Sequence, residues 1–322
     1  MTALQATPKV SVMVITYNFA DIVHETIDSV LSQDYLDFEL IIADDASTDG
    51  TQTILQEYAS RNPDRIKLIL NPKNLGITAN CNVAFFACSG DLIAIMGGDD
   101  VMFPQKISSQ VQVFTSDNKV VLSYHPVEVF DSRTGKTIYV TNQIASEDTP
   151  DVLAIIRQAG IPGASSVMVR RDACPEYGFD TRIPHASDWK QQIDVALRGQ
   201  VVKVNQVLGR YRRHINNVSN RKFELIDESL SVLDITLQEN PDYPGLAEAV
   251  RVGKARYLAG EAYVQMSLNS RRASELIARA LELDPSNYKL RLMNFVNHHA
   301  SLRFLAKHLL PKFRRFLKRW AS

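Results

Sequence analysis

The stretch DLIAIMGGDD (residues 91–100) is an apolar run that ends in two carboxylates. Two earlier stretches, KVSVMVITYN (9–18) and FELIIADD (38–45), repeat this pattern of an apolar run followed by polar side chains. Continuous apolar runs rich in β-branched residues are typical of strands that are buried on both faces. We therefore predict three central strands. The polar residues at their ends are Tyr17, Asn18, Asp44, Asp45, Asp99 and Asp100.

Segments with a helical spacing of apolar residues separate these strands. They cover residues 20–33, 51–60 and 77–88, and the run RIKLIL (65–70) supplies one more strand. This alternation predicts the α/β class, with a mostly parallel central sheet that has helices on both faces. Ligands of such sheets bind outside the carboxyl ends of the strands, and the polar residues above would meet there.

The pattern changes after the first hundred residues. Strand-like runs occur at 120–130, 136–140 and 164–171, and the chain turns all-helical from about residue 221. One stretch of the helical part has the spacing of the second helix of a tetratricopeptide repeat. The residues at that spacing are Ala273, Ile277, Ala280 and Pro285. A single repeat cannot form a solenoid, so we predict a small helical appendage that could offer a surface for protein contact.

The charge balance hides two parts of opposite sign. The 322 residues include 36 Lys and Arg against 36 Asp and Glu, and no acidic residue follows Asp284. The last 22 residues hold seven of the basic side chains, which leaves 29 basic and 36 acidic in the first 300. A hydrophobic share of 45% and a charged share of 22% argue against extensive disorder and against a fibrous repeat. Three cysteines without metal-ligand spacing argue against a disulfide framework and favour a reducing compartment.

The basic C-terminal segment interleaves its cations with apolar side chains. One helix face would carry Leu302, Leu305, Leu309, Phe313, Phe316 and Trp320. Phe and Trp beside Lys and Arg are typical of a helix lying in an anionic membrane interface. The alternative is a terminal helix that packs its apolar face on the body of the protein. We expect no membrane-spanning helix and no nucleic-acid partner, because no long apolar run and no recognition module accompany the basic residues.

Adjacent carboxylates at a strand end suit a hard divalent cation. Mg²⁺ and Mn²⁺ prefer oxygen ligands and keep waters or substrate phosphates in their shell, so Asp99 and Asp100 with a diphosphate would form such a site. The alternative is a solvated turn, and the pair Asp44 and Asp45 leaves the same choice open. Neither the GxGxxG turn nor GxxxxGK[ST] follows the first strand, which argues against a Rossmann dehydrogenase and a P-loop enzyme.

A series of motifs in order resembles the family 2 inverting glycosyltransferases of the GT-A fold. They are ITYN (15–18), DDASTDGT (44–51), NLG (74–76), GDLIAIMGGDD (90–100), SDW (187–189) and YRRHINNVS (211–219). The resemblance covers roughly residues 8–220. It implies a GT-A-type sheet domain, a nucleotide-diphosphate sugar as donor, and Mn²⁺ or Mg²⁺ as cofactor. The predicted domains are 1–220, a GT-A glycosyltransferase domain; 221–300, the helical appendage; and 301–322, a basic amphipathic helix.

The resemblance also implies where the donor binds. Tyr17 and Asp45 match positions that hold the base and the ribose, and we assign the neighbouring Asn18 and Asp44 to the same site. Many relatives carry Arg where this chain has Cys81. The donor phosphates would then need another cation, which Arg212 or the adjacent arginine of the YRRH string could supply.

The metal and the catalytic base follow from the remaining motifs. Asp99 and Asp100 match the metal-and-ribose motif usually written DxD, although the first Asp of the commonest pattern is Gly97 here. His214 matches a position that closes over the diphosphate or the metal. Asp188 matches the general base, for which the alternative is a helix N-cap.

These assignments predict an inverting, metal-dependent glycosyltransferase that acts on an acceptor hydroxyl. We expect the acceptor to be a cell-surface polysaccharide or a lipid-linked glycan. We also expect a cytoplasmic protein, peripheral on the cytoplasmic face of the membrane if the basic helix binds there. One alternative is a sugar nucleotidyltransferase, which usually has a glycine- and basic-rich loop after the first strand. Another is a degenerate transferase that serves as a protein-docking module.

Overall fold

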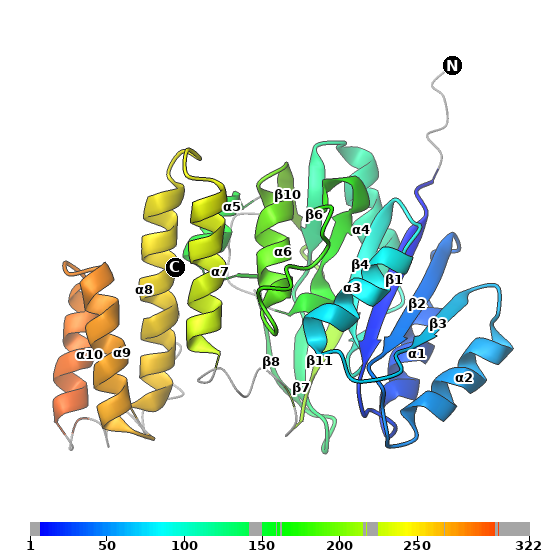
Figure 1. The fold of residues 1–322 in the computed structure, drawn as a ribbon, viewed down its shortest axis with the longest axis horizontal. Coiled ribbons are helices and arrows are strands. Elements are labelled where there is room, and N and C mark those ends of the chain that lie inside the picture. Colours follow the sequence, from blue (N-terminus) through cyan, green and yellow to red (C-terminus); the bar gives the residue numbers. More distant parts are fainter. Residues whose placement is uncertain are drawn as a thin grey trace. The chain divides into compact units, whose positions relative to one another are not determined.

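Figure 1 shows the computed structural model, which describes residues 7–141, 150–158, 160–161, 163–214, 217, 225–266, 268–299 and 302. The chain divides into two compact units, each with its own hydrophobic core. The first unit comprises Met1–Val152 and Gly160–Asn220. The second comprises Leu153–Ala159 and Arg221–Ser322, so a short segment from within the sheet region belongs to the helical unit.

The first unit is built on a seven-stranded sheet with the order β10-β6-β9-β4-β1-β2-β3. Its strands are β1 (Val10–Thr16), β2 (Phe38–Asp44), β3 (Ile66–Leu70), β4 (Leu92–Gly97), β6 (Val120–Tyr124), β9 (Met168–Arg170) and β10 (Gln200–Lys203). β1 pairs in parallel with β2 and β4, and β2 pairs in parallel with β3. β9 runs antiparallel to both of its neighbours. The predicted mostly parallel α/β sheet is therefore confirmed.

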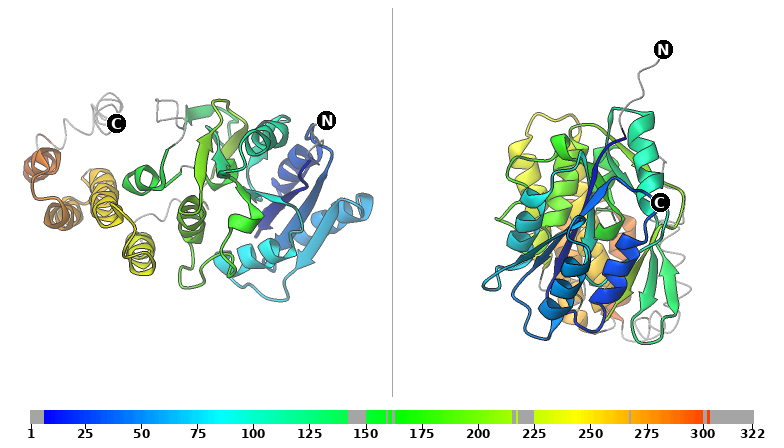
Figure 2. Two further views of the ribbon diagram at one scale, coloured as in Figure 1. Left: turned by 90° about the horizontal axis from the view of Figure 1, so that it is seen from above. Right: turned by 90° about the vertical axis from the view of Figure 1, so that its right-hand side faces the viewer.

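Helices cover both faces of this sheet. They are α1 (Val23–Leu31), α2 (Thr51–Arg61), α3 (Ile77–Ala87), α4 (Lys106–Ser116) and α6 (Ser187–Ala196). Figure 2, in the view from the side, shows α1 and α4 on one face and α3 and α6 on the other. Each of the three helices predicted between the first four strands is present, within a few residues of its expected ends.

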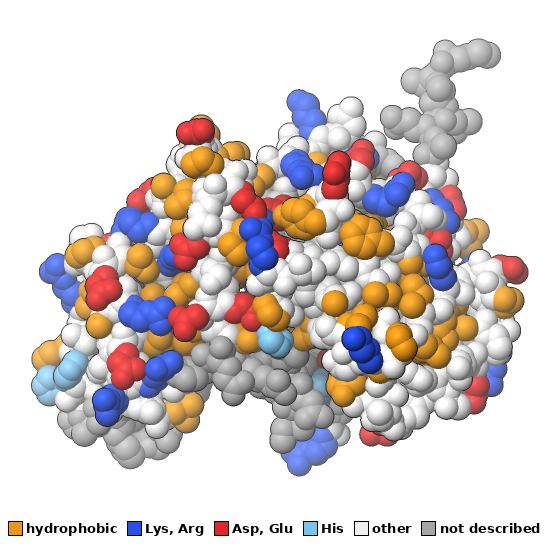
Figure 3. Space-filling view, in the orientation of Figure 1, with side chains coloured by type: hydrophobic (Ala, Val, Ile, Leu, Met, Phe, Trp, Pro, Cys, Tyr) orange, Lys and Arg blue, Asp and Glu red, His pale blue; other side chains and the backbone are white. Residues whose placement is uncertain are grey.

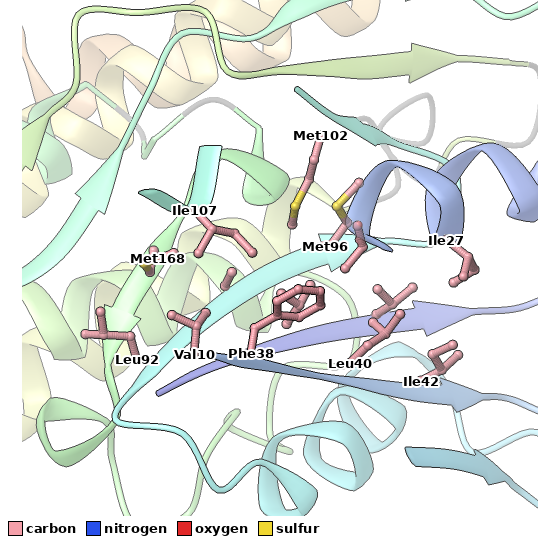
Figure 4. Close-up of a cluster of buried hydrophobic side chains, with 14 of the residues drawn as sticks. Val10, Ile27, Phe38, Leu40, Ile42, Leu92, Met96, Met102, Ile107 and Met168 are labelled. Carbon is pink, nitrogen blue, oxygen red and sulfur yellow. The ribbon is translucent and has the colours of Figure 1, made fainter. Parts of the chain in front are cut away.

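The core between the sheet and α1, α2 and α4 is made of aliphatic side chains, methionines and two phenylalanines, Phe38 and Phe114 (Figure 4). β1 and β2 supply alternate residues to it, because successive side chains of a strand point to opposite faces. The intervening residues of β1 and β2, such as Met13 and Ile41, are buried as well. Burial of one such side chain contributes about 1.5–3 kcal/mol. Strands that are apolar on both sides therefore require a helical layer on each.

A smaller sheet, of order β5-β11-β7-β8, brings two distant motifs together. Its strands are β5 (Val101–Met102), β7 (Glu128–Asp131), β8 (Thr137–Val140) and β11 (Gly209–Arg213). β5 follows the acidic motif directly, and its antiparallel pairing with β11 joins Val101 to Arg210 and Met102 to Gly209. This register places the YRRH string beside the two carboxylates.

Two predicted strands differ from the structure in detail. The run 120–130 forms β6 and β7, which belong to different sheets. The run 164–171 is a strand only over its last part, because Ala164–Ser166 forms a 3₁₀ turn, η1. This turn starts from Gly163 at φ +81°, a conformation that glycine adopts readily.

The helical unit consists of antiparallel helices around a separate core. Its helices are α5 (Val152–Arg157), α7 (Ile226–Glu239), α8 (Leu246–Gln265), α9 (Ser270–Leu283) and α10 (Tyr288–His298). Ile277 and Ala280 are buried in this core, and Ala273 is buried as well. α5 approaches α8 closely at Gly253, where an added Cβ would lie 2.4 Å from the carbonyl oxygen of Ile156.

Charges of both signs are interspersed over the helical unit on the face shown in Figure 3. The ion pairs of this unit include Arg251 with Glu248 at 2.6 Å and Arg279 with Asp227 at 2.9 Å. Exposed pairs of this kind contribute little to stability, so the unit depends on its apolar core. In the described part of the chain, no helix has both the length and the apolar character needed to cross a bilayer. The basic helix is predicted over residues 301–322, and of these all but Leu302 lie outside the described residues.

The buried Lys106 yields a prediction about stability. Its side chain is fully buried in α4, its ammonium donates to Gln110 Oε1 at 2.8 Å, and burial lowers its pKa to about 7. An unfolded lysine has a pKa of about 10.4. Between these values the unfolded chain binds more protons, so this group favours folding increasingly as the pH rises. Lys106→Met should abolish that contribution, which amounts to about 1.4 kcal/mol per pH unit between pH 7 and 10.

Urea denaturation of both proteins at pH 7, 8, 9 and 10 measures this. The free energy of unfolding of Lys106→Met, relative to that of the wild type, should be highest at pH 7. This difference between the two proteins should shrink as the pH rises. Lys119→Met, at an exposed lysine just after α4, is the control, and its difference in stability from the wild type should not change with pH. If the differences of the two variants from the wild type changed equally with pH, the assignment to Lys106 would be contradicted.

Candidate active site

The carboxyl ends of β1, β2 and β4 meet at one edge of the large sheet. In the parallel register Thr16 pairs with Asp44, and Ile15 pairs with Gly97. The strands continue this contact beyond their ends, because Asp45 N donates to the carbonyl of Thr16 at 2.9 Å. The predicted convergence of the acidic pairs on one edge is therefore present.

Asp44 has a structural role at this edge. Its carboxylate is fully buried and accepts hydrogen bonds from Thr16 Oγ1 (2.9 Å), Ser47 N (2.9 Å) and Gln52 Nε2 (2.8 Å). The Ser47 hydroxyl also donates to it, at 2.5 Å. The hydrogen bonds to Ser47 and Gln52 hold the loop between β2 and α2 in its conformation. The carboxylate is thus engaged by four protein donors, and the donor-binding role of Asp44 stays a prediction.

Asp45 holds the loop between β3 and α3. Its Oδ1 accepts from Leu75 N at 2.7 Å, and its Oδ2 accepts from Gly76 N at 2.9 Å. Asn71 Nδ2 lies 3.3 Å from Oδ1. The second and third strand ends are thus tied together through one carboxylate, and the NLG motif owes its position to it.

Tyr17 and Asn18 follow β1 and behave differently. The Tyr17 side chain is 46% exposed and presents its ring at the sheet edge. Asn18 adopts φ +56° and joins two loops, since its N donates to Ser47 Oγ (2.8 Å) and its Oδ1 accepts from Thr48 N (2.9 Å). Tyr17 is therefore available to a ligand, whereas the Asn18 side chain shapes the loops around it.

The two carboxylates of the acidic motif have separate environments. Asp100 is buried, its Oδ1 accepts from Arg212 N at 2.9 Å, and its Oδ2 accepts from the Ser165 hydroxyl. Burial and the neighbouring charge of Asp99 raise the pKa of Asp100 well above its usual value, against the opposing effect of those hydrogen bonds. These partners join β4, η1 and β11, and the metal-ligand role of Asp100 stays a prediction.

Asp99 is the more accessible of the pair, with its side chain 14% exposed. Its Oδ2 lies 2.9 Å from His214 Nε2 and 3.3 Å from Asn217 Nδ2. Within the described residues no hydrogen bond reaches Oδ1. The ring of Phe19 meets the imidazole of His214 edge-on, with centroids 5.8 Å apart. Asp99 and His214 are thus brought together as predicted.

Arg212 is hydrogen-bonded to the backbone of the acidic motif. Its Nε donates to the Asp99 carbonyl at 2.7 Å, its Nη2 donates to Glu25 at 2.6 Å, and its guanidinium lies over the Phe130 ring at 4.7 Å. The side chain is only 3% exposed. The guanidinium is thus engaged by protein groups, and the contact of Arg212 with donor phosphates stays a prediction.

Asp188 lies in the first turn of α6 and is half-buried. The N-cap of this helix is Ala186, so the alternative of Asp188 as the N-cap is not realised. Cys81 of α3 is buried near both Asp188 and Asp45, and burial together with these two charges raises the pKa of its thiol. The raised pKa keeps the Cys81 thiol in its protonated, neutral form near these two carboxylates.

The donor set allows a limited test for a metal. Among the residues that the structure describes, no group of three His, Cys, Asp or Glu side chains converges to hold an ion. Asp99 and His214 offer a carboxylate and an imidazole at one point. Mg²⁺ is commonly bound through one or two protein ligands, with phosphates and waters completing the shell. The residues fit a cation that depends on its substrate for the remaining ligands.

Several site residues could not be read from the motifs. Ser165 lies in a segment predicted as a strand, and Glu25 lies in a helix with ordinary spacing. Both reach the acidic motif only through the fold. Asn217 belongs to the string YRRHINNVS, so its motif marked the segment but not its contact with Asp99.

With this geometry established, comparison with known proteins identifies the family. The model of the family described as "Glycosyl transferase family 2" matches residues 11–178. The chain belongs to this family. An Escherichia coli protein, UDP-Glc:alpha-D-GlcNAc-diphosphoundecaprenol beta-1,3-glucosyltransferase WfaP, is 30% identical over 224 residues, which are 68% of this chain and 84% of that protein.

Other relatives are matched over less of their length. The uncharacterized glycosyltransferase alr2836 of Nostoc is 32% identical over 168 residues, or 51% of each chain. The chain thus spans about half of the length of that relative. Among solved structures, Staphylococcus aureus TarS 1–349 with UDP-GlcNAc superposes with a TM-score of 0.66 at 16% identity, covering 92% of this chain and 88% of TarS. At this identity the likeness concerns the fold, which is of the GT-A type.

The two glycines before the acidic pair yield a matched prediction for this family 2 domain. A Cβ on Gly98 would lie 2.5 Å from Thr16 Cγ2 and 2.9 Å from the carbonyl of Ile15. A Cβ on Gly97 would lie 2.8 Å from Asp99 Oδ1, which is the end of a side chain that can rotate. Gly98→Ala should therefore cost about 1–3 kcal/mol of stability, as overpacking typically does.

The free energy of unfolding from urea denaturation measures this effect. Gly97→Ala is the control and should cost much less, because the Asp99 carboxylate can move away. Equal losses of free energy of unfolding in the two variants would contradict the prediction that close packing of β1 against Gly98 is what excludes a side chain there.

Proposed function

We propose that this family 2 protein transfers a sugar from a nucleotide-diphosphate sugar to an acceptor hydroxyl, with inversion at the anomeric carbon and with a divalent cation. The observation that carries the proposal is the accessible pair Asp99 and His214 at the edge where β1, β2 and β4 end. Asp188 lies in the same unit at the start of α6 and is the general base in this proposal.

The donor would bind along the β1 and β2 ends. The exposed ring of Tyr17 offers a surface on which a nucleotide base can stack. Asp45 lies at the next strand end and retains an Oδ2 with a single hydrogen bond among the described residues, from Gly76 N. A carboxylate oxygen can accept more than one hydrogen bond, so it could also accept one from the base or the ribose.

The cation would be held by Asp99 and His214, with the donor diphosphate completing its shell. When bound, it would stabilise the negative charge that develops on the leaving phosphate. The chain's own contribution is to hold Asp99 in place. Arg212 does so from below through the Asp99 carbonyl, and Asn217 does so through the carboxylate.

Asp188 would act as the general base. An acceptor hydroxyl becomes a good nucleophile only as its proton is removed, and a carboxylate within about 3 Å can accept that proton. Attack on the side opposite to the leaving group inverts the configuration of the anomeric carbon. One base is then sufficient, and no covalent intermediate on the protein is required.

The acceptor is proposed by analogy. The name of the E. coli relative WfaP describes a glucosyltransferase that acts on GlcNAc-diphosphoundecaprenol. A lipid-linked or cell-surface glycan is therefore the acceptor class that we propose for this chain. The S. aureus and Pyrobaculum calidifontis structures, titled with UDP-GlcNAc and with GDP-Man and Mn²⁺, suggest donors for a first panel.

The first test separates binding from transfer. UDP-glucose, UDP-GlcNAc and GDP-mannose are assayed with and without Mn²⁺, for binding by calorimetry and for transfer by release of nucleoside diphosphate. Asp99→Asn should weaken Mn²⁺-dependent binding by at least about tenfold, since loss of even an outer-shell partner costs that much. Asp188→Asn should leave donor binding unchanged and slow transfer by about 10²–10⁴-fold, because only the base is lost.

Asp64→Asn, at an exposed carboxylate in the turn before β3, is the control and should change neither quantity. Transfer that survives Asp188→Asn would rule out this base. Release of pyrophosphate in place of nucleoside diphosphate would favour a nucleotidyltransferase. Absence of any donor binding would favour a docking module.

We also propose that the C-terminal part binds an anionic membrane surface. Residues 303–319 supply seven cations among Leu and Phe side chains, and no acidic residue follows Asp284. The preceding α10 exposes Tyr288, Leu292 and Phe295, at the spacing of one helix face. Near a membrane each cation is worth about 1 kcal/mol against anionic lipid.

Deletion of residues 302–322 tests this proposal. Co-sedimentation with phosphatidylglycerol vesicles should fall by at least tenfold, because the seven cations are lost. Vesicles of phosphatidylcholine are the control and should bind both proteins weakly. Unchanged partitioning after the deletion would exclude the segment as an anchor.

A further inference from the structure

The first turn of α3 lies between the two ends of the active site. Its neighbour on one side is the β2 edge with Asp45, and on the other side it contacts the segment that leads into α6 and Asp188. Cys81, one turn further along α3, is close to both carboxylates. The contacts of this turn therefore bear on the placement of one carboxylate relative to the other.

Thr78 makes the contact with the α6 side. Its hydroxyl is buried, with the residue only 4% exposed, and Oγ1 lies 2.6 Å from the Ile183 carbonyl and 2.8 Å from the Pro184 carbonyl. Ser187 Oγ lies 2.7 Å from the same atom. A hydroxyl can donate one proton and accept others. Thr78 can thus donate to a carbonyl while it accepts from Ser187, so that one atom holds the last turn before Asp188.

The N-cap of α6 does not contribute a capping side chain. It is Ala186, whose methyl group cannot accept a hydrogen bond, and within the first turn Trp189 N donates to Asp188 Oδ1 at 2.8 Å. Replacing an N-cap Ser, Thr, Asp or Asn by Ala typically costs about 1 kcal/mol. The hydrogen bond between Thr78 and Ser187 is a tertiary contact at the residue directly before Asp188.

The opposite side of the same turn is anchored to the donor edge. Asn80 is buried, its Nδ2 donates to the Ala43 carbonyl at 3.0 Å, and its Oδ1 accepts from Asn71 Nδ2 at 2.9 Å. Asn71 in turn reaches Asp45. Two residues of one helical turn, Thr78 and Asn80, therefore face the two parts of the site, and the rigid backbone of α3 sets the distance between them.

We propose that Thr78 is a positioning residue, whose buried hydroxyl bonds the segment 183–187 to α3 and so holds Asp188 at a set distance from the donor-binding edge. The proposal rests on the function proposed above, in which Asp188 is the base. Thr78 does not touch the substrate. It acts through Ser187 and the start of α6.

The experiment compares Thr78→Val, which keeps the shape and removes the hydroxyl, with Thr78→Ser, which keeps the hydroxyl. With the donor that the wild type cleaves fastest among UDP-glucose, UDP-GlcNAc and GDP-mannose, Thr78→Val should lower kcat by about 10–100-fold, as a displacement near 1 Å can. The KM for the donor should stay within about twofold, because the β1 and β2 ends are untouched. Thr78→Ser should restore most of kcat.

Two further measurements separate positioning from general damage. Thr236→Val removes a buried hydroxyl from α7, where Oγ1 donates to the Val232 carbonyl at 2.8 Å, and it should leave kcat unchanged. Hydrogen exchange of the amides of residues 186–190 should be faster in Thr78→Val than in the wild type. Ser187→Ala removes the partner hydroxyl, and its loss of kcat should not add to that of Thr78→Val.

The outcomes that overturn the proposal are distinct from those that overturn the function. Wild-type kcat in Thr78→Val, a rise in donor KM without a fall in kcat, or equal losses in the Val and Ser variants would each contradict the positioning role. If Thr78→Val fails to fold, unaltered kcat and exchange in Ser187→Ala would contradict it. Wild-type transfer activity in Asp188→Asn would instead contradict the assignment of Asp188 as the base, whatever the results for the Thr78 variants.

Discussion

The parallel register of β1 with β2 and β4 is the constraint on which the rest of the structure depends. It aligns three strands so that Thr16, Asp44 and Gly97 end at one edge. The side chains of these strands are buried on both faces of the sheet. A shift of the register by one residue would move every side chain to the opposite face and would displace the polar ends of the strands from one another. The hydrophobic layers therefore fix where the carboxylates appear. The active site is a consequence of how the core packs.

The acidic motif shows how such an edge can hold charge. Asp100 is buried and accepts hydrogen bonds from Ser165 and the Arg212 amide, and its neighbour Asp99 keeps an accessible carboxylate. A buried carboxylate is costly unless it is hydrogen-bonded, so Asp100 requires partners from other elements. Those partners join β4, η1 and β11 around the motif. One carboxylate of the pair is thus held by neighbouring elements, and the other stays partly exposed at the edge of the sheet.

Much of the fold could be read from the sequence because its signals are local. Apolar runs and helical spacing identified the first four strands and the helices between them, with ends within a few residues. The η1 turn was read as a strand, since its form depends on Gly163 and on a contact with Asp100 far along the chain. The change of sheet between β6 and β7 was also missed. Pairing partners are set by the whole chain, and no local pattern encodes them.

The residue types at the site, and their order along the chain, were present in the sequence. Asp45, Asp99, Asp188 and His214 stand in motifs whose chemistry is legible from carboxylates, imidazole and spacing. What each side chain touches was settled by packing. The carboxylate of Asp44 and the guanidinium of Arg212 are buried and hydrogen-bonded to protein groups. The chemical character of a side chain belongs to the residue, but its access to a ligand depends on the neighbours that cover it. Those neighbours can be far away in the sequence, as Glu25 of α1 is, 187 residues from Arg212.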